Sequence, residues 1–351
     1  MGFGGSFKTK YLAYVSAEHP TLPSAELKAL LEAEDVPFHV EERLPGILLI
    51  ESPRPVEEVA KSLKRASMMK ALYRLILDSQ LQPEELKREV DGLEPPAEKG
   101  GTFSLRVNRA PTLSVKVDTA RLEHLIGDLL RRKMGWSVDL KNPQVWFQGF
   151  ALPDRILLGL NLYRRPLRAF ESREPGARPR FHPATLTPKL ARCMVNLSRA
   201  RTGHLLLDPF CGVGGVLIEA GLIGCQVIGV DAQRRMCEGC LENLRHYGVN
   251  ALGVLWGDAL HLPVSQVDRV VADPPYGTAA STMKRSMKTL LEGFMPQCAS
   301  ILTRDGFACL AAPLGLGLAN IGSAAGLTPV ENHQIYVHRR LTREIVVFKK
   351  P

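Results

Sequence analysis

The feature that most constrains the fold is a regular alternation of strand-like and helix-like segments in the second half of the chain. From about Thr185, short apolar runs alternate with segments in which apolar residues recur at a helical period. The expected strands are 205–207, 227–230, 253–256 and 267–272, with helices at 216–220 and 236–246. Such an alternation predicts parallel strands joined by helices, and therefore a doubly wound α/β sheet.

Three more strands are expected near the end of the chain, at 307–311, 334–337 and 344–348. A short connection joins the last two, which predicts an antiparallel edge on the otherwise parallel sheet. The first hundred residues indicate a smaller α+β unit, with strands at 11–15 and 46–50 and a helix at 23–31 capped by Ser24 or Thr21. A half-exposed strand at 103–109 and a helix from Asp118 to Lys133 follow.

Acidic residues follow the expected strands of the second half at the points where those strands end. They are Asp208, Asp231, Asp258 and Asp273. Any one of them alone is more often a helix cap. Because open α/β sheets bind ligands at the carboxyl ends of their strands, four in register predict a binding site there.

A glycine-rich loop, 208–215, connects the first of these strands to its helix. Gly212 and Gly214 allow a tight turn and close approach of a ligand to the backbone. Asp231 lies 19 residues beyond Gly212, a spacing at which a carboxylate reaches ribose hydroxyls. Asp258 offers an acceptor for an adenine amino group. The pattern predicts a nucleotide-like cofactor.

Three segments carry a family resemblance: Phe181-His-Pro-Ala-Thr-Leu-Thr-Pro-Lys-Leu-Ala-Arg192, the Asp208-Pro-Phe loop and Asp273-Pro-Pro-Tyr-Gly277. They resemble the archaeal tRNA guanosine-10 N2-methyltransferases, which are S-adenosylmethionine-dependent enzymes with a Rossmann-like sheet. Segments 103–109 and 138–143 resemble the THUMP RNA-binding domain that precedes the methyltransferase domain in that family. The resemblance covers nearly the whole chain, and residues 1–50 are similar only in outline, to a ferredoxin-like part.

This resemblance implies an α/β fold in which a ferredoxin-like and THUMP region, 1–163, is joined by a linker, 164–184, to a methyltransferase domain, 185–351. It implies S-adenosylmethionine as cofactor and tRNA as substrate. The cofactor-binding residues it indicates are His182, Thr185, Asp208, Phe210, Gly212, Gly214, Asp231, Ala232, Asp258 and Ala259. The catalytic residues it indicates are Asp273, Pro274, Pro275 and Tyr276.

The chemistry of the Asp273–Tyr276 corner explains why these residue types are needed. An exocyclic amine on a base is a poor nucleophile, because its lone pair is delocalised into the ring. The side chain of Asp273 and the backbone carbonyl of Pro274 can accept its two hydrogens and direct the lone pair at a methyl donor. The prolines hold this geometry rigid, and Tyr276 can stack on the base.

The middle of the chain is strongly basic, which indicates a polyanionic partner. Residues 101–182 carry 15 Lys and Arg against 7 Asp and Glu, whereas residues 1–100 carry 13 against 17. The alternative is a solvated basic face. The residues expected to contact tRNA are Arg106, Arg109, Lys116, Arg131, Arg132, Lys133 and Lys141.

Other features exclude some classes of protein. Segment 306–330 carries no charge, but its prolines and glycines favour strand, loop and short helix over a membrane span, so a cytoplasmic protein is expected. Cys237 and Cys240 lie in a helical pattern without a second ligand pair, which favours helix packing over a metal site. Val213 stands where the family more often has Thr or Ser.

Competing functions remain open at this point. A DNA amino-methyltransferase can share the Asp-Pro-Pro-Tyr corner, and a sister family methylates another tRNA guanosine, such as position 6. A non-catalytic RNA-binding protein would also keep the fold. The sequence does not decide between one methyl group and two, nor whether a small activator subunit is needed; a monomer is expected.

Overall fold

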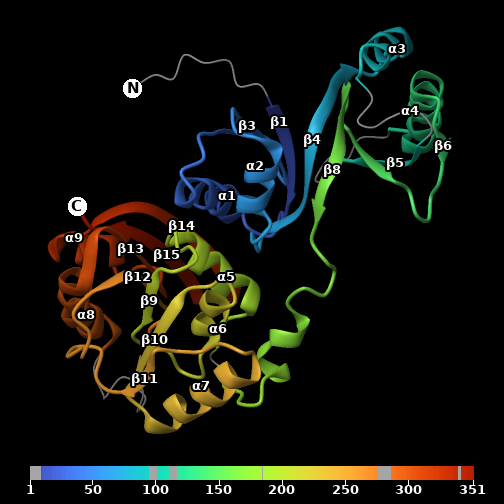
Figure 1. Ribbon diagram of the computed structural model, residues 1–351. Helices are drawn as coiled ribbons and strands as arrows, with labels where there is room; N and C mark the ends of the chain where they lie inside the picture. The colour runs from blue at the N-terminus through green and yellow to red at the C-terminus, as the bar shows by residue number, and fades with distance from the viewer. Residues whose placement is uncertain (1–8, 95–100, 111–116, 184, 276–285, 339–340) are drawn as a thin grey trace. The chain divides into compact units, whose positions relative to one another are not determined.

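The computed structural model describes residues 9–94, 101–110, 117–183, 185–275, 286–338 and 341–351. The chain forms two compact units (Figure 1). The first comprises Met1–Ser24, Asp35–Lys64 and Met69–Pro166. The second comprises Ala25–Glu34, Arg65–Met68 and Leu167–Pro351.

The first unit is built on one eight-stranded sheet with the order β2-β3-β1-β4-β8-β7-β5-β6. Its strands are β1 (Thr9–Val15), β2 (His39–Leu44), β3 (Ile47–Ser52), β4 (Met69–Gln80), β5 (Thr102–Arg109), β6 (Ser137–Val138), β7 (Val145–Ala151) and β8 (Arg155–Arg164). The helices in this part of the chain are α1 (Leu22–Ala33), α2 (Val56–Leu63), α3 (Pro83–Asp91) and α4 (Thr119–Met134). Helices α2, α3 and α4 belong to the first unit, whereas α1 from Ala25 onward belongs to the second. The long antiparallel strands β4 and β8 run through the middle of the sheet.

Helix α4 shows how local sequence fixes an element. The Asp118 side chain accepts a hydrogen bond from the Arg121 amide at its start. Gly135 ends the helix in the left-handed conformation, with φ of 68°. Its apolar stripe includes Leu122, Ile126 and Leu130, which pack with β5 and β7 in a buried cluster. The expected capped helix is confirmed.

The second unit contains a seven-stranded sheet with the order β11-β10-β9-β12-β13-β15-β14. Its strands are β9 (Leu205–Asp208), β10 (Gln226–Asp231), β11 (Gly253–Trp256), β12 (Val267–Ala272), β13 (Leu302–Pro313), β14 (Thr328–His338) and β15 (Leu341–Lys349). The helices are α5 (Pro188–Leu197), α6 (Gly215–Gly221), α7 (Arg234–His246), α8 (Met287–Ile301) and α9 (Leu318–Ala324). Strands β9, β10, β11, β12 and β13 are parallel to one another, whereas β15 is antiparallel to both β13 and β14. The expected parallel sheet with an antiparallel edge is confirmed.

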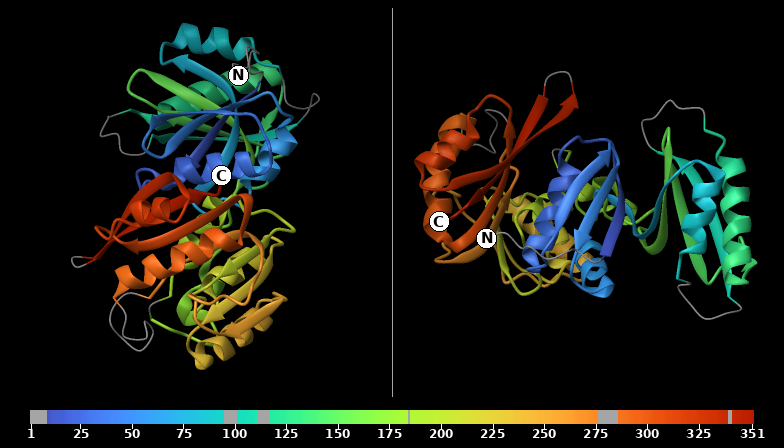
Figure 2. Two further views of the ribbon diagram at one scale, coloured as in Figure 1. Left: turned by 90° about the vertical axis from the view of Figure 1, so that its left-hand side faces the viewer. Right: turned by 90° about the horizontal axis from the view of Figure 1, so that it is seen from above.

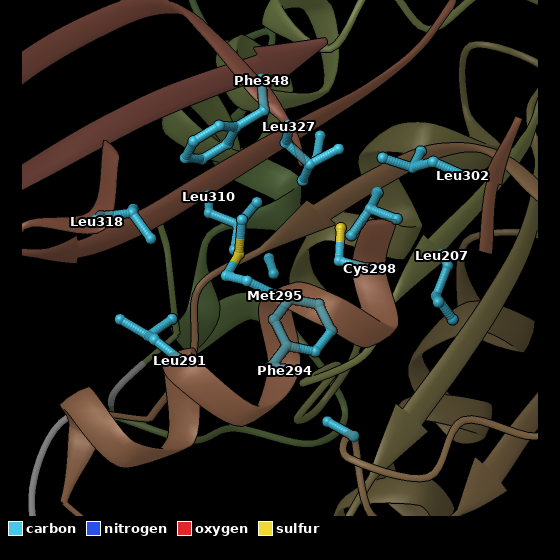
Figure 3. Packing of buried hydrophobic residues seen from close by; sticks show 14 of the residues in the cluster. Leu207, Leu291, Phe294, Met295, Cys298, Leu302, Leu310, Leu318, Leu327 and Phe348 are labelled. Atoms are coloured by element: carbon cyan, nitrogen blue, oxygen red, sulfur yellow. The ribbon is translucent and has the colours of Figure 1, made fainter. Parts of the chain in front are cut away.

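Both faces of this sheet are covered by buried side chains. Phe294, Met295 and Cys298 of α8 lie against strand residues that include Leu310 and Phe348 (Figure 3). Neighbouring residues on the same strands, whose side chains point to the opposite face, are also fully buried. They are Leu206, Val271, Cys309 and Val347. Burial on both faces explains why the central strands β9 and β13 carry continuous apolar runs rather than alternating ones.

The uncharged segment 306–330 forms most of β13, all of α9 and the start of β14, which confirms the strand, loop and short-helix interpretation. Across the part of the chain that is described, we find no helix long and apolar enough to cross a membrane. Cys237 and Cys240 are buried on α7, as helix-packing residues are.

The arginine- and proline-rich stretch after β8 contains two short 3-10 helices, Glu171–Arg173 and Pro175–Ala177. Arg173 joins this stretch to α6 of the second unit, because its Nε lies 2.6 Å from Oε1 of Glu219 on that helix. Arg192 of α5 approaches the same fully buried carboxylate at 2.8 Å. Two guanidinium groups therefore neutralise one buried glutamate, which holds this stretch against α6. Figure 2 shows the backbone, coloured by residue number, in two further views.

Candidate active site

The four acidic residues predicted at strand ends meet at one edge of the second unit's sheet. Asp208 and Asp231 are the last residues of β9 and β10, and Asp258 and Asp273 follow β11 and β12. Because these strands are parallel, their carboxyl ends share an edge. The charges of Asp231 and Asp273 both act on Asp208, so the three carboxyl groups lie close enough to interact. The fold thus brings together the predicted cofactor and catalytic regions.

Asp231 ties the glycine loop to the turn after β10. Its Oδ2 accepts the Gly212 amide at 2.9 Å, and its Oδ1 accepts the Gln233 amide at 2.8 Å. Burial raises the pKa of the Asp231 carboxyl, while these two bonds and nearby His182 oppose the shift. Each oxygen keeps a second acceptor position, so the carboxylate can also receive hydroxyl groups.

The backbone of the glycine loop turns sharply at two residues. Gly212 and Gly214 have φ angles of 49° and 90°, which disfavour any residue with a Cβ. A Cβ on Gly214 would lie 2.8 Å from Sγ of Cys240, so this position also needs glycine for packing against α7. A Cβ on Gly212 would have no described atom within 4 Å. The loop is therefore open at Gly212 and closed at Gly214, which suits a ligand that approaches the backbone at Gly212.

Asn243 on α7 anchors this loop, and the sequence analysis missed it. Its Nδ2 donates to the carbonyls of Val213, at 2.8 Å, and Arg180, at 2.9 Å, while its Oδ1 accepts the Arg180 amide at 2.9 Å. The sequence feature that could have identified Asn243 is its place as a polar residue beside the apolar stripe of Met236, Cys240 and Leu244 on α7. The Val213 side chain is itself buried and lies near Gly239, so it packs against α7.

The segment before α5 lies beside the glycine loop. His182 is close enough for its charge to influence Asp231. Thr185 donates its amide to the His182 carbonyl at 3.2 Å, and its Cγ2 lies 3.0 Å from the Cβ position of Gly215. The structure therefore places both predicted residues at the rim of the loop.

Asp208 is almost completely buried at the start of the loop. Its side chain accepts the Phe210 amide at 3.0 Å, and burial raises the pKa of the carboxyl well above its usual range. The Phe210 ring packs edge-on against Phe294 of α8, with the ring centroids 5.2 Å apart. Asp208 therefore shapes the turn, and Phe210 anchors it to the core.

The residues that follow β10 and β11 lie at the same sheet edge as the glycine loop. The Asp258 carboxylate accepts the Leu260 amide at 3.0 Å, and the Ala259 side chain is buried in the core. The carbonyl of Ala232 accepts a hydrogen bond from Nε1 of Trp256 at 3.0 Å. Trp256, which the sequence analysis did not select, is largely exposed at the end of β11.

The corner that the sequence predicts to be catalytic begins where β12 ends. The Asp273 side chain is only 11% exposed, and its Oδ2 lies 3.7 Å from Nη2 of Arg343 on β15. Pro274 is buried and Pro275 is partly buried. Tyr276 lies outside the described residues. A stiff corner thus presents a carboxylate at the same edge as the glycine loop.

The basic residues expected to bind tRNA lie in the first unit but form two groups. Arg106 and Arg109 are exposed near the end of β5, where Nη1 of Arg106 lies 3.5 Å from Oε2 of Glu123. Lys116 lies outside the described residues. The Val107 amide also donates to Glu123, at 2.7 Å, which ties this end of β5 to α4.

The second group gathers at the start of β5, roughly 20 Å from its end at 3.3 Å per residue. Arg131, Arg132 and Lys133 end α4, and Lys141 follows β6, which pairs with the first residues of β5. Both arginines pair with Asp128, and Lys133 donates to the Asp91 carbonyl at 2.5 Å. All four side chains are exposed.

Two domain families match the chain in the regions that the geometry separates. Residues 83–161 match the THUMP domain, and residues 175–343 match the RMKL-like methyltransferase domain. The methyltransferase match begins before α5 and ends on β15, so it spans the glycine loop, all four acidic residues and Arg343.

Curated relatives cover nearly the whole chain. The tRNA (guanine(10)-N2)-dimethyltransferase of Methanothermobacter thermautotrophicus is 36% identical over 97% of this chain and 99% of its own length. The protein of the same name from Methanocaldococcus jannaschii is 31% identical over the same shares. The tRNA (guanine(6)-N2)-methyltransferase of Thermus thermophilus is 34% identical over 52% of this chain and 54% of its own length.

Among solved structures, TrmN from Thermus thermophilus aligns with a TM-score of 0.56 and 25% identity, covering 97% of this chain and all of its own. SMU.472, described as a putative methyltransferase complexed with SAH, aligns with a TM-score of 0.53 over 98% of this chain. Its identity of 13% supports the fold alone. With a THUMP domain, a methyltransferase domain and full-length relatives above 30% identity, the chain belongs to the archaeal tRNA (guanine(10)-N2)-dimethyltransferase family.

Proposed function

We infer that this protein transfers methyl groups from S-adenosylmethionine to the exocyclic N2 of a guanosine in tRNA, at position 10. The observation that carries the conclusion is the full-length similarity to tRNA (guanine(10)-N2)-dimethyltransferases. The acidic edge of the sheet supports it independently, because it combines a glycine loop with an Asp-Pro-Pro corner. The similarity to tRNA enzymes favours this reading over a DNA amino-methyltransferase.

The residues at the sheet edge fit S-adenosylmethionine, which supplies an electrophilic methyl group when bound. We propose that Asp231 receives the ribose hydroxyls and that Gly212 and Gly214 let the backbone approach the cofactor. The open position at Gly212 supports this assignment. Asp258 and the backbone of Ala232 and Ala259 would border the adenine, with His182, Thr185, Asp208 and Phe210 completing the site.

Asp273 and the Pro274 carbonyl would orient the guanine amine. Both accept hydrogens from N2, which draws the nitrogen toward a pyramidal geometry and directs its lone pair at the methyl carbon. Pro275 keeps the corner rigid, and Tyr276 would stack on the base. Once methylated, the amine is acidic enough to lose a proton to a weak acceptor, so no strong base is needed.

We propose that residues 1–163 hold the tRNA, 164–184 link the parts and 185–351 carry the transfer. The two exposed basic groups would contact phosphates, and their separation along β5 suits a long polyanion. The proposed set is Arg106, Arg109, Lys116, Arg131, Arg132, Lys133 and Lys141. Such contacts set the register of the substrate rather than its base identity.

The deciding experiment incubates the pure protein with labelled S-adenosylmethionine and two tRNA transcripts that differ only at guanosine 10. Nucleoside mass spectrometry should find N2-methylated and N2,N2-dimethylated guanosine in the transcript with guanosine 10 and neither in the adenosine variant. Equal methylation of both transcripts would refute position 10. Mapping the product to guanosine 6 would favour the alternative that the Thermus thermophilus relative suggests.

We propose that the protein acts as a monomer in the cytoplasm. The alternative is a complex with a small activator subunit, for which the exposed Leu255 and Trp256 of the edge strand β11 offer apolar surface. Light scattering measures the mass of the purified protein. Full turnover by the chain alone would remove the need for a subunit.

A further inference from the structure

We propose that Arg343 is a positioning residue for methyl transfer, which holds the Asp273 carboxylate in the orientation that receives the guanine amine. The proposal rests on the proposed function of Asp273. It adds a residue from the antiparallel edge of the sheet, 70 positions further along the chain, to a corner that the sequence presents as self-contained.

The sheet register explains how the two residues meet. Ala272, just before Asp273, pairs with Leu310 of β13, and Pro313 at the end of β13 pairs with Arg343 of β15. Because β15 runs antiparallel to β13, its first residues lie at the edge where the parallel strands end. An arginine near the start of β15 can therefore reach back across the end of β13 to the corner.

The contact lies in a largely dry environment. Nη2 of Arg343 is 3.7 Å from Oδ2 of Asp273, and the two side chains are only 13% and 11% exposed. At this depth the attraction between opposite charges is screened much less than at the surface. A guanidinium also keeps its charge at every pH at which the enzyme works.

Arg343 lies at a sheet edge that carries several acidic side chains. Asp208 and Asp231, from β9 and β10, end at the same sheet edge as Asp273, so acidic side chains are concentrated there. The guanidinium supplies the opposite charge from the other side of the corner. The positive charge attracts the Asp273 carboxylate and restrains its orientation.

The direction of the contact also matters for geometry. Nη2 of Arg343 approaches Oδ2 of Asp273, so the guanidinium restrains the carboxylate from the β15 side. Losing the arginine would let the carboxylate rotate, and in-line transfer is sensitive to small displacements. The expected consequence is a slower transfer step without weaker cofactor binding.

The test compares Arg343→Gln, Arg343→Lys and the control Arg304→Gln in the full-length protein. Arg304 is exposed near the start of β13, so its substitution removes the same charge from the same sheet away from the site. We expect Arg343→Gln to lower kcat by about 10- to 100-fold, the range found when a residue that orients a metal ligand is replaced. The Kd for S-adenosylmethionine and the KM for tRNA should stay within about twofold.

Lysine should recover a large part of kcat, because it restores the charge beside Asp273. Equal losses in the glutamine and lysine variants, with lower melting temperatures in both, would reduce Arg343 to a structural residue. Unchanged kcat in Arg343→Gln would also overturn the proposal.

A double-mutant comparison separates this proposal from the role of Asp273 itself. If Arg343 acts through Asp273, adding Arg343→Gln to Asp273→Asn should lower the residual single-turnover rate by less than about twofold. A further loss as large as that in the parent would mean that Arg343 acts elsewhere. Full activity of Asp273→Asn alone would instead refute the proposed catalytic corner.

Discussion

Replacing Asp231 tests the cofactor site at the residue with the most clearly defined contacts. In Asp231→Ala, the carboxylate that would receive the ribose hydroxyls is lost, and the amides of Gly212 and Gln233 lose their acceptor. In Asp231→Asn, one oxygen remains to hold one of these amides, but the charge is gone. The two variants therefore separate charge from loop support.

The magnitude follows from the kind of bond. A hydrogen bond to a charged group contributes about 1.5–3 kcal/mol, and burial raises the pKa of Asp231, which offsets part of that gain. We expect Asp231→Ala to weaken S-adenosylmethionine binding by about 1–3 kcal/mol, a factor of roughly 5 to 150. The asparagine variant should lose less, because the loop keeps part of its support.

Isothermal titration calorimetry measures the Kd, and a melting curve by circular dichroism shows whether each variant is folded. Glu238→Gln is the matched control, because this exposed acidic residue lies on α7, directly after the β10 turn. An unchanged Kd in a folded Asp231→Ala protein would remove Asp231 from the site. A Kd that rises equally in the control would show a general charge effect.

Three further predictions follow from the other parts of the site. Asp273→Ala should lower kcat at least about 100-fold in a methyl-incorporation assay, while calorimetry finds S-adenosylmethionine binding intact; normal incorporation would contradict the mechanism. Changing Arg106, Arg109 and Lys116 to Glu should raise the KM for tRNA and flatten the salt dependence of tRNA binding, and a parental slope would show that they touch no phosphate. Because the folded pKa of Asp208 is raised by burial, its stabilising contribution is present at low pH and lost as pH rises, by up to about 1.4 kcal/mol per pH unit between the unfolded and folded values. Asp208→Asn should remove that pH dependence from denaturant unfolding, and parallel curves for the two proteins would contradict it.

The sequence by itself determined the elements and the sheet edge at which the candidate site lies. Apolar runs with glycine-containing connections specify parallel strands, and a residue that directly follows such a strand must lie at its carboxyl end. Asp208, Asp231, Asp258 and Asp273 could therefore be placed from local pattern alone. The capped helix from Asp118 to Gly135 was readable for the same reason, since capping depends on neighbouring residues.

Only the tertiary structure decided which of these residues touch. The order of the strands brings Arg343 to Asp273, and α7 brings Asn243 to the carbonyl of Val213. It also divides the basic residues of the first unit between the two ends of β5, where the sequence presented a single basic stretch. These contacts join residues far apart in the chain, and local propensity carries no information about such pairs. They follow from sheet register and from the need of buried polar groups to find partners, which exist only once the chain is folded.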